Sequence, residues 1–165
     1  MGPAPLMPVL VQSHVRTVQF NRKWIVRLAQ ALLTRVGESA AELGLVFVGD
    51  RRMRRLNRVY RHKDRTTDVL AFALREAVPP RVLGRASAPL GDVVISIPTA
   101  LRQAKESRRS LDHEIAVLMI HGILHLCGYD HERSRAEARR MQRRERSLLA
   151  GLEPIPRLVA RVTGR

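Results

Sequence analysis

Apolar residues recur along the chain in two rhythms, and these rhythms predict its elements. Trp24, Ile25, Leu28 and Leu32 follow the helical period, which predicts a helix from the N-cap Asn21 to about Val36. Short apolar runs bounded by polar or turn residues predict four strands, over 9–12, 44–48, 68–72 and 91–96.

The remaining helices are predicted by their end signals. Asp50 is expected to cap a helix over 51–61, and Pro98 suits the first turn of a helix that runs to about 106. Ser110 is expected to cap a long apolar helix over 111–126, which Gly128 would end. A final, very basic helix is expected over 134–149.

The order of these elements predicts one α+β domain over residues 1–165, with a small mixed four-stranded sheet and helices packed on it. Residues 77–89 contain three prolines and are expected to form a surface excursion. Residues 1–7 and 151–165 are expected to be loose termini.

The charge of the chain changes the picture of its partners. Thirty basic residues against 15 acidic ones give a formal net charge of +15. Such a surface attracts polyanions, with nucleic acid as the first candidate and an anionic membrane surface as the second. An arginine-preferring genome would produce the same excess. No apolar run approaches the ~20 residues that span a bilayer, and the single Cys127 cannot form an internal disulfide. A cytoplasmic protein is therefore expected.

Three histidines carry the strongest chemical signal. His121 and His125 are four residues apart in the predicted apolar helix, so their imidazoles lie one turn apart on the same side. Gly128 allows a sharp turn that can return His131 to the same point. Three imidazole nitrogens with one open position are typical of catalytic zinc, so we predict one Zn²⁺ per chain. The neighbouring Cys127 is interpreted as a small, buried apolar residue.

The spacing is that of metzincin proteases, in which a glutamate follows the first histidine. Gly122 stands there instead, which argues against a metallopeptidase and leaves the general base unassigned. Glu114, two turns earlier on the same helix, is one candidate, although it also suits the positive end of the helix. Asp130 is a candidate to orient a ligand histidine by accepting a hydrogen bond from the ring nitrogen that does not bind the metal.

The run HGILHLCGYDH at 121–131 resembles the signature of the YbeY family of bacterial zinc-dependent endoribonucleases of ribosomal RNA maturation. LNRVYRHKDRTTDVLAF at 56–72 and LGDVVIS at 90–96 resemble two further family segments, so that the likeness covers about residues 45–148. The chain departs from the family at Thr66, where proline is usual. It also departs around Phe72, which serine and proline commonly flank.

The resemblance implies zinc on His121, His125 and His131, and a functional arginine at Arg61. A guanidinium can grip phosphate oxygens in two places, although most arginines are simply solvated surface charges. The implied partner is RNA, in particular ribosomal RNA of the small subunit, with ribosomal or assembly proteins as further partners.

Three functions follow as hypotheses. The first is a zinc-dependent endoribonuclease for single-stranded RNA, with water or the ribose 2′-hydroxyl as the attacking group. The second is a non-catalytic, zinc-containing RNA-binding assembly factor, which the open fourth ligand position argues against. The third is a metallopeptidase, disfavoured by Gly122 and by the cationic surface.

Overall fold

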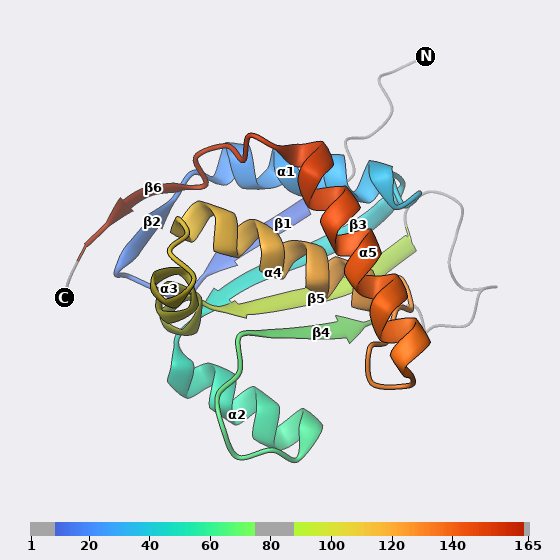
Figure 1. Ribbon diagram of the computed structural model, residues 1–165. Coiled ribbons are helices and arrows are strands. Elements are labelled where there is room, and N and C mark those ends of the chain that lie inside the picture. The colour runs from blue at the N-terminus through green and yellow to red at the C-terminus, as the bar shows by residue number, and fades with distance from the viewer. Residues whose placement is uncertain (1–8, 75–87, 164–165) are drawn as a thin grey trace.

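The computed structural model describes residues 9–74 and 88–163 (Figure 1). Its elements in chain order are β1 (Val9–Ser13), β2 (Val18–Phe20), α1 (Arg22–Arg35), β3 (Ala41–Val48), α2 (Asp50–Arg61), β4 (Val69–Ala73), β5 (Ala88–Ser96), α3 (Ile97–Glu106), α4 (Leu111–Leu126), α5 (Arg135–Leu152) and β6 (Val159–Val162). The expected termini 1–7 and most of the expected excursion over 77–89 lie outside the described residues.

The main sheet has four strands in the order β1-β3-β5-β4. The first three run parallel, and β4 pairs antiparallel with β5, with Ala71 opposite Val93. Parallel neighbouring strands need a crossover connection, and α1 lies in the connection between β1 and β3. The predicted α+β class and mixed four-stranded sheet are confirmed.

Helix α4 forms the centre of the fold. It lies across one face of the sheet, with α1 and α5 beside it (Figure 1), while the view from behind shows the strands with no helix crossing them. Ten of its sixteen residues are buried, Ile115, Met119 and Leu124 among them. Each large apolar side chain of this kind contributes about 1.5–3 kcal/mol when fully buried, so α4 is held firmly. The Ser110 hydroxyl accepts a hydrogen bond from the backbone N–H of His113 (3.1 Å), which confirms the predicted cap.

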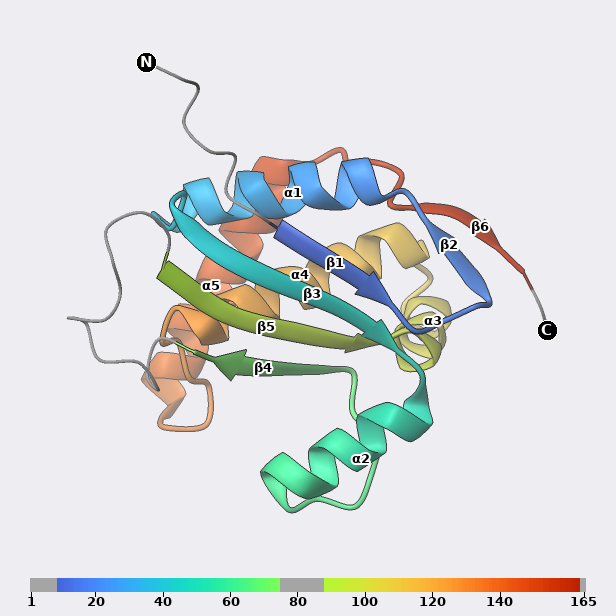
Figure 2. The same ribbon diagram turned by 180° about the vertical axis from the view of Figure 1, so that it is seen from behind.

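Helix α2 extends away from this body, below β4 in Figures 1 and 2. It is attached through a small apolar cluster made of Val48, Met53, Leu70 and Val94. Only Met53 and Asn57 of the helix are buried, so most of its surface faces solvent.

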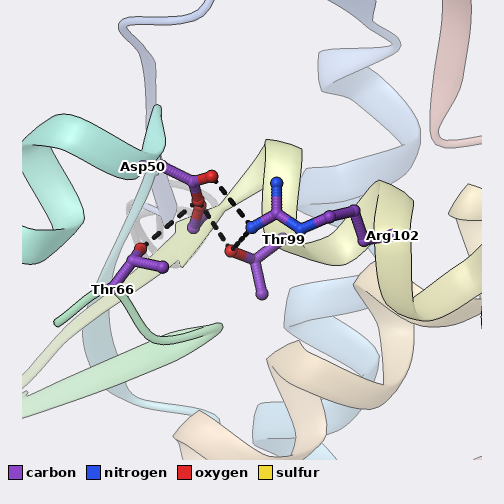
Figure 3. Close-up of polar contacts among 5 residues, drawn as sticks. Asp50, Thr66, Thr99 and Arg102 are labelled. Carbon is purple, nitrogen blue, oxygen red and sulfur yellow. Dashed lines mark hydrogen bonds and ion pairs between the residues drawn. The ribbon is translucent and has the colours of Figure 1, made fainter.

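Asp50 fixes the start of α2 in a way that differs from the prediction. The capping position belongs to Gly49, and Asp50 makes no capping bond. Its carboxylate instead accepts hydrogen bonds from Ser96 (2.6 Å), Thr99 (2.7 Å), Thr66 (3.3 Å) and Arg102 (2.9 Å), most of which Figure 3 shows. This one side chain therefore joins the start of α2 and the loop after it to the junction of β5 and α3.

The expectation of a loose C-terminal tail is wrong for the described part of that segment. Helix α5 continues to Leu152, and β6 pairs antiparallel with β2, with Val18 opposite Val162. Leu158 is fully buried, and the Asp112 carboxylate accepts the backbone N–H groups of Leu158 (2.8 Å) and Val159 (2.7 Å). The prediction missed both strands because each is short and its partner is distant in sequence.

Candidate metal centre

The three predicted histidines converge on one point. His121 and His125 project from the C-terminal half of α4, and the Nε2 atoms of the two rings are 3.1 Å apart. Gly128, with a φ of +96°, turns the chain after the helix in the left-handed conformation that glycine adopts without strain. This turn returns His131, and one nitrogen of each ring lies within 4.8 Å of the other two.

A glutamate that the sequence analysis missed holds the first histidine. The Glu145 carboxylate on α5 lies 2.5 Å from Nδ1 of His121. A proton on Nδ1 satisfies that contact. The lone pair on Nε2 is then free to bind a metal ion at the point where the three rings converge. The signal for Glu145 was a carboxylate on the last helix, but sequence spacing alone does not show that α5 packs against α4 here.

The electrostatics around His125 favour its neutral form. Burial lowers the pKa of His125, and the neighbouring His121, His131 and Arg61 lower it further, while Asp130 acts in the opposite direction. A neutral ring keeps a nitrogen lone pair for a cation. Three imidazole nitrogens that lie within 4.8 Å of one another, on rings of which one is oriented by a carboxylate, fit a transition metal such as Zn²⁺.

The histidines open into a polar hollow of about 430 Å³. The end of α2 and the loop that follows also line this hollow, with the cations Arg61, Lys63 and Arg65. The structure therefore brings Arg61 to the same hollow as the histidines, although the two lie 60 or more positions apart in sequence. A metal-binding corner and a cationic wall face one space.

Glu114 is placed differently. It lies in the first turn of α4, seven residues or about 10 Å along the axis from His121. Burial raises the pKa of Glu114; the charge of Arg109 opposes this and that of Asp68 adds to it. Glu114 does not line the hollow, so its role as a general base stays a prediction without support from proximity. The carboxylates that do line it are Asp68, Asp130 and Glu132.

Asp130 lies in the hollow but is engaged elsewhere. Its Oδ1 accepts the backbone N–H of Glu132 (2.9 Å), and its Oδ2 lies 3.2 Å from Nε of Arg133. The hydrogen bond from the Glu132 backbone and the charge of Arg133 hold the pKa of Asp130 below its ordinary value. The observed contact to a ligand histidine comes from Glu145 instead.

Gly122 is a point of close packing. A Cβ atom there would lie 2.5 Å from Cγ1 of Val93 on β5, which is closer than real side chains approach. Any side chain at this position, including the glutamate of zinc peptidases, would require Val93 or α4 to shift. Cys127, just past the end of α4, packs half-buried against the core, close to the interpretation from sequence.

The family model for "Endoribonuclease YbeY" matches residues 11–153. A relative of that name from Geobacter metallireducens is 42% identical over 152 residues, covering 89% of this chain and 97% of its own. Another of that name, from Aquifex aeolicus, is 39% identical and covers 87% of this chain and 91% of its own.

Among solved structures, the solution structure of TM1509 from Thermotoga maritima is similar, with a TM-score of 0.58 and 24% identity over 86% of this chain and 87% of that one. This likeness concerns the fold. Within residues 9–74 and 88–163, no helix combines the length and apolar character needed to cross a membrane. The family match along most of the chain confirms the resemblance seen in its motifs: this chain belongs to the YbeY family of endoribonucleases.

Proposed function

We propose that this chain is a zinc-dependent endoribonuclease that cleaves single-stranded RNA, and that it acts on ribosomal RNA during maturation of the small subunit in the cytoplasm. One observation carries the proposal: three histidines within 4.8 Å of one another share a hollow with Arg61. A Lewis acid and a cation that grips the phosphate oxygens both assist cleavage of a phosphodiester, and this hollow offers residues for both.

His121, His125 and His131 would hold the metal. When bound, Zn²⁺ polarises a phosphate oxygen or activates water. The task of the protein is to keep His125 neutral, which its burial supports, and to orient His121, which the contact with Glu145 supports.

Arg61 would bind the scissile phosphate from the end of α2. Its fork matches two phosphate oxygens and offsets the charge that grows as the bond breaks. Lys63 and Arg65 add positive charge beside it. A proton-transfer group must lie within hydrogen-bond reach of the reacting atoms, and Asp68, Asp130 and Glu132 line the hollow whereas Glu114 does not.

The leading alternative is a non-catalytic assembly factor with structural zinc. Structural zinc sites are usually closed by four protein ligands, whereas the cluster among the described residues has three. Ribosomal or assembly proteins remain proposed partners of this chain under either hypothesis.

The test is cleavage of a labelled single-stranded RNA by the purified protein, with and without a chelator, beside the variant Arg61→Glu. We expect the chelator to abolish cleavage and Arg61→Glu to lower kcat/KM by about 100-fold or more while metal content stays unchanged. Arg146→Glu, an equal charge reversal on the exposed face of α5, is the matched control. Full metal content without any cleavage would favour the assembly factor instead.

A further inference from the structure

Helix α2 carries a row of arginines on its outer face. At 100° per residue, five arginines fall within about 120° of the helix circumference. They lie opposite the buried Met53, and all are exposed. We call this set the α2 stripe: Arg51, Arg54, Arg55, Arg58 and Arg61.

The α2 stripe is continuous with the proposed active site. Arg61, at its C-terminal end, lines the hollow of the three histidines. Arg65 lines that hollow and also a second one of about 500 Å³, whose wall includes Arg51 and Arg54. A cationic surface thus leads out of the hollow and along the helix, which is about 18 Å long.

The geometry of the α2 stripe is fixed by polar contacts at several points. Asp50 ties the first turn of α2 to β5 and α3 (Figure 3). The Asn57 amide donates to the carbonyl of Arg65 (2.9 Å), and Arg54 forms an ion pair with Asp64 (2.9 Å). These contacts hold the helix and the loop after it together, so the stripe keeps its position relative to the hollow.

We propose that the α2 stripe is a track for the RNA strand that extends beyond the scissile phosphate. This inference rests on the proposed function, because it takes the histidine hollow as the place of cleavage. A single strand is a line of phosphates, and a line of exposed guanidinium groups that begins at the hollow matches it. Because of the track, the affinity of the protein for RNA should rise with RNA length and fall with salt concentration.

Helix α5 offers a natural contrast. Arg139, Arg143 and Arg146 are also exposed and lie within about 60° on its outer face. No arginine of α5 lines the histidine hollow. Helix α5 therefore carries exposed positive charge that is not continuous with the histidine hollow. A comparison of α2 with α5 distinguishes a track for RNA from the general attraction of a cationic protein for RNA.

The test compares two triple variants that remove equal charge. The first is Arg51→Gln, Arg55→Gln and Arg58→Gln; the second is Arg139→Gln, Arg143→Gln and Arg146→Gln. None of the six side chains makes a hydrogen bond or ion pair within the described residues, so both proteins should fold. Binding of a long single-stranded RNA is measured across salt concentrations in the His125→Ala background, which prevents cleavage. Cleavage of a long RNA and a trinucleotide is measured with His125 intact.

For the α2 variant we expect roughly tenfold weaker binding of the long RNA, and a log–log salt slope shallower by about 2, because each lost single-strand phosphate contact removes about 0.7. Its kcat/KM for the trinucleotide should stay within about twofold of wild type, and the α5 variant should match wild type throughout. Equal losses in both variants, or a loss on the trinucleotide as large as on the long RNA, would overturn the track. Binding that depends on the α2 stripe without any cleavage would support the track and overturn the nuclease.

Discussion

Helices α4 and α2 supply the two halves of the proposed site, and they are built in opposite ways. Ten of sixteen residues of α4 are buried, and its histidines emerge from the end of a helix packed on the sheet. Only two of the twelve residues of α2 are buried, and Arg61 lies at the exposed end of that helix. The metal-binding half of the site thus belongs to the core of the domain. The phosphate-binding half belongs to α2, which extends from that core and is called the arm below.

This difference has an energetic meaning. Opening α4 would expose many large apolar side chains, so it costs nearly the whole free energy of unfolding. Opening α2 would expose Met53 and a few partners and would break the contacts of Asp50. Local opening of the arm is therefore expected at a lower free energy than that of the metal-binding half.

The largest effect should come from removing a ligand on the core side. We expect His125→Ala to lose metal and all metal-dependent cleavage, because two imidazoles cannot hold the ion as three do. Metal content of the purified protein is the measurement, with the exposed His14→Ala as control. A His125→Ala protein that retains a full equivalent of metal would refute the assignment.

A smaller effect is expected from the contact behind His121. Glu145→Gln keeps the shape of the side chain but removes its charge, so metal affinity should fall about 10–100-fold. Competition with a chromophoric chelator measures this, and Glu153→Gln, exposed beyond α5, is the control. Unchanged affinity would show that Glu145 does not orient the ligand.

The close approach of α4 to the sheet predicts a change in stability. Gly122→Ala places a methyl group against Val93 and should destabilise the protein by about 1–3 kcal/mol, as overpacking does. Urea unfolding of both single variants and the double variant Gly122→Ala with Val93→Ala measures the coupling. The double variant should be more stable than the sum of the single changes predicts; simple additivity would contradict the contact.

The smallest expected effect concerns the arm. Burial alone would raise the pKa of Asp50, but hydrogen bonds from Ser96, Thr99 and Arg102 and the charge of Arg102 hold it below its ordinary value. An acid whose pKa is lowered on folding stabilises the protein above its unfolded pKa, and this stability is lost as pH falls through the folded pKa.

Asp50→Asn should therefore cost about 1 kcal/mol near neutral pH, less than the ~1.5–3 kcal/mol of a hydrogen bond to a charged group, because the carboxylate is partly exposed. The difference from wild type should shrink as the solution is acidified below pH ~4. Urea unfolding across pH measures it, and hydrogen exchange should show faster opening in α2 than in α4. A difference that is constant with pH would exclude the charge as its cause.

The sequence predicted what is local. The histidine spacing, the Ser110 cap and the apolar period of α4 depend on neighbours within a few turns, and the structure confirms those elements. The contact of Glu145 with His121 and the pairing of β2 with β6 depend on tertiary packing, which spacing does not encode. Asp50 shows the same limit, because its position suited a cap while its partners come from β5, α3 and a loop.

The pairing of β2 with β6 also implies a delay during synthesis, because β2 is made long before its partner strand. The backbone N–H of Thr163 bonds to the carbonyl of Thr17, 146 residues earlier in the chain. At about 5–20 residues per second, a ribosome makes Thr17 roughly 7–30 s before Thr163. During that interval the partner strand of β2 is incomplete. The Asp112 carboxylate at the start of α4 likewise waits for the backbone N–H groups of Leu158 and Val159, made 46 and 47 residues later. The second sheet can therefore form only after Val159–Val162 has been synthesised.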